Sequence, residues 1–133
     1  MSGSLTGGCL CGTVAYEVED AFGYALICHC SQCRRATGSA FKPFGGIEVG
    51  KVRVTAGEDA LMRFGGEDAH DLHCGTCGSL LWSVVRDGAF AHVTYGTLRD
   101  APSTAPGAHI FVGSKAPWYK IADGLPQFEE FPG

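Results

Sequence analysis

Seven cysteines are the residues with the clearest chemical potential, and all of them lie in three short clusters. The clusters are Cys9-Leu-Cys11, Cys28-His-Cys30-Ser-Gln-Cys33 and Cys74-Gly-Thr-Cys77. An odd number of cysteines gathered in this way fits a disulfide framework badly. Zinc takes four soft ligands in a tetrahedron, and two thiolates separated by one or two residues can supply half of them. The spacing therefore predicts metal-bound thiolates.

Counting ligands divides the clusters into two sites. The two pairs together supply four thiolates, enough for one closed structural site: Cys9, Cys11, Cys74 and Cys77. The triplet supplies three: Cys28, Cys30 and Cys33. Three protein ligands with one free position are typical of catalytic zinc, whereas four close the coordination shell. The alternative is that His29 or His73 completes a second structural site, and spacing alone leaves both interpretations open.

The remaining histidines and the polar residues of the triplet loop carry weaker signals. His29 and His73 are each adjacent to a cysteine ligand, so either could donate a hydrogen bond to a thiolate or transfer protons near neutral pH. Three further histidines are expected to be surface or internally hydrogen-bonded strand residues: His70, His92 and His109. Ser31 and Gln32 could contact a substrate.

Alternation with a period of two residues dominates the chain and predicts strands. The expected strands cover residues 13–19, 24–28, 51–55, 61–64, 80–85, 89–95 and 108–112, and Asp87-Gly88 predicts a hairpin turn. Only residues 32–40 look helical. We therefore expect a mainly β protein of antiparallel sheets with at most one or two short helical turns. The aromatic residues of the Pro-containing C-terminal stretch, such as Trp118, are expected to cover the core.

Length and charge narrow the class of protein. The chain has 133 residues, which predicts a single domain over residues 1–133. Its formal net charge is −4, and bound thiolates would make it more negative, so nucleic acid is not an expected partner. The start of the sequence contains no apolar stretch suited to a signal peptide or a membrane span, so we expect a cytoplasmic protein without membrane contact. Edge strands would permit a homodimer.

Four segments together resemble the successive signatures of one family: GGCLCGTVAYEV, CHCSQCRRATGSAF, HCGTCGSLLW and HIFVGSKAPWY with DGLPQF. The family is that of the glutathione-dependent formaldehyde-activating enzymes, which includes centromere protein V, and the likeness extends over about residues 7–128. It implies a zinc-centred β-tent with two zinc ions, one structural and one catalytic, in the cysteine sites already counted. It also implies a carbon–sulfur lyase that forms or cleaves S-hydroxymethylglutathione.

On this resemblance, the zinc at the triplet would keep one position for a thiol sulfur or an adduct oxygen. Three cations follow the triplet and could pair with glutathione carboxylates: Arg34, Arg35 and Lys42. The simpler interpretation is that they are solvated surface cations. A non-enzymatic, zinc-stabilised binding module is the alternative to the lyase, and a small-molecule thiol such as glutathione is the expected partner of the enzyme.

Overall fold

The computed structural model describes residues 3–132, and within them the chain is built mainly from strands. The first five strands are β1 (Ser4–Gly8), β2 (Ala15–Glu19), β3 (Tyr24–Cys28), β4 (Lys42–Glu48) and β5 (Val52–Ala56). The second five are β6 (Leu61–Gly65), β7 (His70–Cys74), β8 (Leu80–Val85), β9 (Phe90–Thr94) and β10 (His109–Ile110). One α-helix, α1 (Ser31–Thr37), follows β3, and four short 3-10 turns join other elements. The prediction of a mainly β fold is confirmed.

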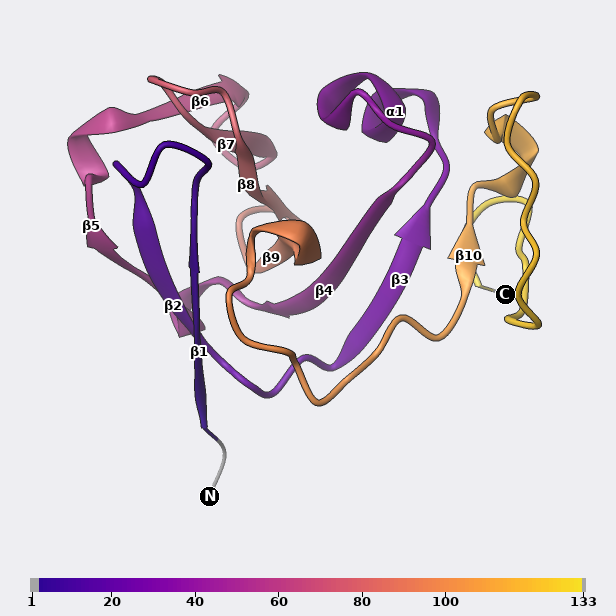
Figure 1. The fold of residues 1–133 in the computed structure, drawn as a ribbon, viewed down its shortest axis with the longest axis horizontal. Coiled ribbons are helices and arrows are strands. Elements are labelled where there is room, and N and C mark those ends of the chain that lie inside the picture. Colours follow the sequence, from indigo (N-terminus) through magenta and orange to yellow (C-terminus); the bar gives the residue numbers. More distant parts are fainter. Residues whose placement is uncertain (1–2, 133) are drawn as a thin grey trace.

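The strands form two sheets. A three-stranded sheet has the order β1-β2-β5, and a seven-stranded sheet has the order β10-β3-β4-β9-β8-β7-β6. Neighbouring strands run antiparallel, except that β10 pairs with β3 in parallel. In Figure 1 the smaller sheet lies at one end of the larger sheet, α1 lies above β3 and β4, and the C-terminal segment packs outside β10.

The main core lies between the two sheets. Alternate residues of β2, Tyr16 and Val18, pack with alternate residues of β9, Ala91 and Val93. The ring of Tyr16 meets Trp82 edge to face at a centroid distance of 5.3 Å. Burial of these side chains holds the two sheets together, and each large one, such as Val18 or Val93, is worth about 1.5–3 kcal/mol. The opposite face of the larger sheet is left free to form a site.

Strand β4 is an interior strand of the larger sheet, between β3 and β9, yet the sequence pattern does not indicate it. Its segment KPFGGIE contains Pro43 and two glycines, residue types that are depleted in strands. The glycines are required by close packing. A Cβ atom at Gly45 would come within 2.6 Å of the Phe22 ring, and one at Gly46 would overlap the ring of Tyr24. Strands β1 and β7 were also absent from the sequence prediction.

Two other expectations are refined by the structure. The helix ends at Thr37, because Gly38 adopts a left-handed conformation with φ of 64° and caps it. The C-terminal stretch is irregular as expected, but Trp118 is 71% exposed, so the prediction that it covers the core is wrong. Tertiary packing decides this, because the stretch docks through Phe128 instead. Within residues 3–132, no helix is long and apolar enough to cross a membrane.

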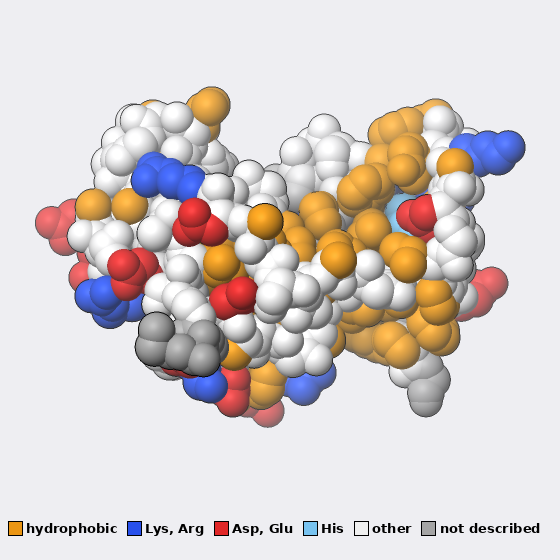
Figure 2. Space-filling model, turned by 60° about the horizontal axis from the view of Figure 1, so that its bottom comes forward, with side chains coloured by type: hydrophobic (Ala, Val, Ile, Leu, Met, Phe, Trp, Pro, Cys, Tyr) orange, Lys and Arg blue, Asp and Glu red, His pale blue; other side chains and the backbone are white. Residues whose placement is uncertain are grey.

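Surface composition differs between the two ends of the molecule. Figure 2 shows hydrophobic side chains gathered over the C-terminal part, whereas charged side chains are scattered over the part that contains the smaller sheet. Among the exposed large apolar side chains, Trp118 and Phe131 belong to the C-terminal segment.

Candidate metal centres and the adjoining cleft

The two cysteine pairs, from the first and third clusters, come together at the end of the molecule that contains the smaller sheet. Their four sulfurs lie within 4.8 Å of one another: Cys9, Cys11, Cys74 and Cys77. The Sγ atom of Cys11 lies 3.7 Å from that of Cys9 and 3.8 Å from that of Cys74. Four thiolates at about 2.3 Å from one zinc ion would be about 3.8 Å apart, so these separations fit a tetrahedral zinc site.

Hydrogen bonds favour the thiolate form at two positions of this cluster, Cys9 and Cys77. The backbone N–H of Val14 donates to Cys9 Sγ at 3.2 Å. The Ser79 hydroxyl and backbone lower the pKa of Cys77 to about 5, so this thiol ionises readily. Because Cys74 is fully buried in the main core, the cluster joins the first β-hairpin to the β7–β8 turn. Four thiols at these separations could hold one metal ion and close its coordination shell.

The triplet forms the second cluster, where β3 passes into α1. The sulfurs of Cys28, Cys30 and Cys33 lie within 4.8 Å of one another. Cys30 is the N-cap of α1, and its Sγ accepts a hydrogen bond from the backbone N–H of Cys33 at 3.3 Å. Hydrogen bonds from the neighbouring Cys28 and Cys33 thiols lower the pKa of Cys30 far below its ordinary value. The three donors fit a soft metal such as zinc.

Neither candidate histidine joins a cysteine cluster in the described part of the chain. His29 turns away from the triplet, and its Nε2 atom lies 2.8 Å from Nδ1 of His109. Nε2 of His109 lies 3.0 Å from both carboxylate oxygens of Asp123. The Nδ1 atom of His73 lies 3.2 Å from the Gly78 carbonyl oxygen. The buried pair His29 and His109 thus anchors the C-terminal segment, and the triplet keeps three protein donors.

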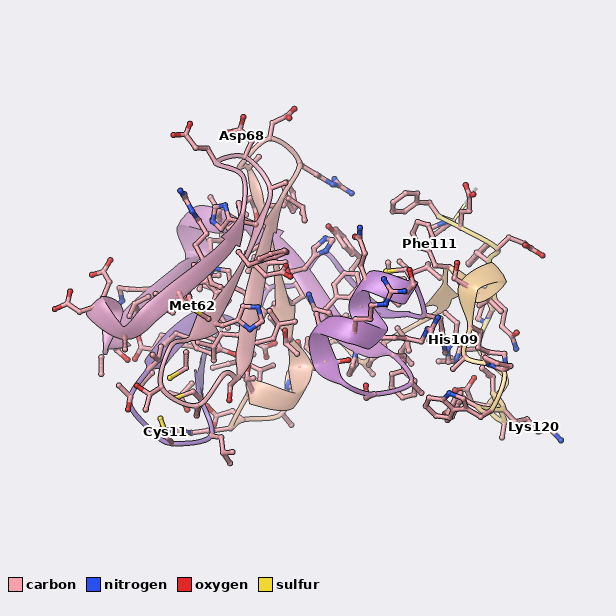
Figure 3. The ribbon with its side chains drawn as sticks, turned by 90° about the horizontal axis from the view of Figure 1, so that it is seen from above. Cys11, Met62, Asp68, His109, Phe111 and Lys120 are labelled. Atoms are coloured by element: carbon pink, nitrogen blue, oxygen red, sulfur yellow. The ribbon has the colours of Figure 1, made fainter. Side chains whose placement is uncertain are left out.

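The triplet borders a cleft on the free face of the larger sheet. A cavity of about 180 Å³ is lined by Cys33 together with Gln32, Lys42, Asp71, Ser83 and His92. A wider hollow of about 660 Å³ adjoins it between α1 and strands β6 to β8, where Arg35 and Phe64 lie on the lining. In Figure 3, Asp68 marks the β6–β7 turn on one side of this region and Phe111 marks the C-terminal segment on the other.

Sheet register explains why the cleft is polar at this point. Asp71 pairs with Ser83 across β7 and β8, Ser83 pairs with His92 across β8 and β9, and His92 pairs with Gly46 across β9 and β4. Paired residues point to the same face of a sheet. A polar row therefore runs across the sheet, and it ends at Tyr24, whose hydroxyl lies 2.7 Å from Nε2 of His92.

Lys42 is buried at the inner end of the cleft. It is 4% exposed, and its Nζ donates to Ser83 Oγ at 2.8 Å, while Ser83 donates to Asp71 Oδ1 at 2.6 Å. Burial lowers the pKa of Lys42, and the charges of Cys33 and Asp71 oppose that effect. The interpretation of Lys42 as a solvated surface cation is wrong. Arg35 is exposed at the wider hollow, and Arg34 is half-buried.

A family model of the glutathione-dependent formaldehyde-activating enzymes matches residues 4–114, most of the chain. The chain belongs to this family. The resemblance seen in the sequence is thereby confirmed, and the family associates the chain with glutathione-dependent activation of formaldehyde.

One solved structure of similar fold is the crystal structure of a Rhodobacter sphaeroides protein from a structural-genomics programme. It has 28% sequence identity and a TM-score of 0.61, and the match covers 74% of this chain and 91% of that chain. None of the curated proteins matches this chain.

In this member of the family, three residues that the sequence did not single out as site candidates line the cavity beside Cys33: Asp71, Ser83 and His92. His92 stacks on Phe44 at a centroid distance of 4.2 Å, and burial followed by the charges of Lys42 and Arg86 lowers the pKa of His92 to about 4. Alternation along residues 80–85 does place Ser83 on one face of a strand. Only the pairing of distant strands brings it to Lys42, and that pairing has no local signal.

Proposed function

We propose that the protein is a cytoplasmic, zinc-dependent carbon–sulfur lyase that forms and cleaves S-hydroxymethylglutathione or a related thiol–aldehyde adduct. In the forming direction, the thiol sulfur bonds to the carbonyl carbon and the thiol proton ends on the carbonyl oxygen. The observation that supports this function is the junction of a three-thiol cluster, a cleft and a buried lysine at one point, Cys33 with Lys42. A purely structural zinc site would not need a cavity beside it.

The donor set of Cys28, Cys30 and Cys33 would hold the second zinc ion, which when bound supplies a Lewis acid with a free position. The buried ammonium of Lys42 offsets the negative charge of the thiols and of an incoming sulfur. Through Ser83, Lys42 is linked to Asp71, so the chain offers both a donor and an acceptor for the proton that moves between sulfur and oxygen.

The wider hollow is suited to the rest of the thiol substrate. Glutathione carries two carboxylates, and Arg35 on the hollow's lining could pair with one of them through two parallel hydrogen bonds. Arg34, on the same helix, is the second candidate for substrate contact. Lys42 lies too deep to reach solvent and is assigned to the reacting atoms rather than to the carboxylates.

The test is the exchange rate between formaldehyde and its glutathione adduct, measured by NMR on wild type, Cys30→Ser and Thr55→Ala, a control at an exposed residue of β5. The proposal predicts two zinc ions per wild-type chain, with one lost on brief chelation together with the activity. Cys30→Ser should stay folded, keep one zinc ion and lose at least 100-fold in catalysed exchange, while Thr55→Ala remains within about threefold of wild type.

Two results would reject the lyase. Full activity of Cys30→Ser would show that the triplet is not the reaction centre. A wild-type protein with two zinc ions that catalyses no exchange would favour the alternative, a zinc-stabilised binding module.

A further inference from the structure

A second hollow adjoins the cleft along the same face of the sheet. It measures about 650 Å³, and its lining includes Tyr24, Leu26, Phe44, Arg86, Ile110 and Phe131. The volume is in the range of small-molecule pockets, about 300–1,000 Å³. Nearly all of this lining is aromatic or aliphatic, in contrast to the polar cavity beside Cys33. We call it the apolar groove.

The sheet register connects the apolar groove to the triplet. Leu26 pairs with Phe44 across β3 and β4, and the next pair on the same face is Cys28 with Lys42. Phe44 packs in one cluster with Cys28, and the partly buried Cys30 and Cys33 join that cluster.

His92 and Val85 line both the groove and the small cavity that contains Cys33. An elongated molecule could therefore reach from the triplet into the groove without leaving the surface of the sheet.

Neither half of the simplest substrate explains the groove. Formaldehyde has no substituent to place there, and glutathione is a polar, charged peptide that suits the other hollow, at Arg35. An aromatic lining favours a flat, apolar group, because rings gain both burial and offset or edge-to-face contacts.

The groove's lining also includes a cation. The guanidinium of Arg86 lies 5.4 Å from the ring centroid of Tyr24 and 5.0 Å from that of Phe90. The side chain is exposed, so its remaining donors can meet a carboxylate. The combination of a ring-sized apolar slot and a cation selects an aromatic group that carries an anion.

We propose that the apolar groove binds the substituent of the aldehyde that reacts with the thiol. The substrate class is an aromatic aldehyde with a carboxylate on its ring, bound either free or as its thiol adduct. This inference rests on the proposed lyase function. The step balances as before: the sulfur–carbon bond forms, the thiol proton moves to the carbonyl oxygen, and no oxidant or reductant is needed. Cleavage reverses each change.

The first experiment measures binding, independently of catalysis. The zinc-loaded protein is titrated with 4-(hydroxymethyl)benzoate by calorimetry, next to Leu26→Trp, which fills the groove, and Arg86→Gln, which removes its cation. We expect wild type to bind the probe and Leu26→Trp to weaken binding at least tenfold. Arg86→Gln should weaken binding of this probe three- to tenfold, but leave binding of benzyl alcohol, which lacks the carboxylate, unchanged. Absence of probe binding to wild type would overturn the inference.

The second experiment measures exchange of the glutathione adducts of 4-carboxybenzaldehyde and of formaldehyde. Leu26→Trp should lose at least tenfold in kcat/KM for the aromatic adduct and less than twofold for formaldehyde. If formaldehyde exchanges and the aromatic adduct does not, the groove inference fails while the lyase stands. If neither adduct exchanges but the probe binds and Leu26→Trp blocks it, the lyase fails and the groove remains a site for aromatic carboxylates. If Leu26→Trp does not fold, the test of the groove rests on Arg86→Gln, which should weaken binding of 4-(hydroxymethyl)benzoate and leave binding of benzyl alcohol unchanged.

Discussion

Replacing Ser83 by alanine tests whether the buried ammonium of Lys42 depends on a single hydroxyl. The change removes the 2.8 Å bond from Lys42 and the 2.6 Å bond to Asp71. A hydrogen bond to a charged group is worth about 1.5–3 kcal/mol, and Lys42 is only 4% exposed, so water in the cavity that it lines would replace the lost bond only in part. Asp71 is only partly buried, so water can replace its lost bond at small cost. We expect Ser83→Ala to lower the free energy of unfolding by about 2 kcal/mol, about 30-fold in the equilibrium constant.

A double-mutant cycle separates this effect from simple loss of packing. In Lys42→Met the ammonium is gone, so adding Ser83→Ala should cost only about 0.5–1 kcal/mol, and the coupling energy should be about 1–1.5 kcal/mol. The assay is urea unfolding of the zinc-loaded protein, followed by the fluorescence of the buried Trp82. Ser114→Ala, at an exposed serine in the turn after β10, is the matched control and should change stability by less than 0.5 kcal/mol.

The reasoning would be refuted by additive energies in the cycle, or by a cost of Ser83→Ala no larger than that of the control. Either outcome would mean that Lys42 finds another acceptor, so the chain Lys42, Ser83 and Asp71 could not serve as the proton path of the proposed reaction.

Two further predictions concern the closed cysteine cluster and His92. Cys74→Ser should lose one zinc ion and at least about 3 kcal/mol of unfolding free energy, because the four ligands join distant segments of the chain. Thr76→Ala, at an exposed residue of the same turn, is the control. A Cys74→Ser protein that stays stable and keeps all its zinc would contradict the assignment. The folded-state pKa of His92 lies near 4, below the ordinary 6.5, so stability should fall as pH drops from 6.5 towards 4. An NMR titration of the His92 imidazole checks this, and the dependence of stability on pH should be weaker in His92→Gln. An imidazole titration midpoint above pH 6 would contradict the prediction.

Local sequence was informative wherever the chemistry is local. Cysteines one or two residues apart can turn toward one point within a short segment, so the meeting of Cys28, Cys30 and Cys33 was predictable from their spacing. Cys30 also caps the short helix that contains Cys33. Strands β3 and β8 were located to the residue, because a short run of apolar, β-branched and aromatic residues is a property of one segment. The odd cysteine count and the clustering sufficed to predict two separate sites.

Tertiary structure alone decided what surrounds the triplet. Strand β4 could not be identified from its local sequence, because one proline and two glycines oppose strand propensity. Gly45 and Gly46 are required there by close contact with the rings of Phe22 and Tyr24. Lys42 was expected beside the triplet, but its burial and its bond to Ser83 follow from strand order and register, which are set by long-range packing. The sequence by itself therefore indicated the cysteine clusters that could hold metal ions, while the pairing of distant strands determined the cleft beside the triplet.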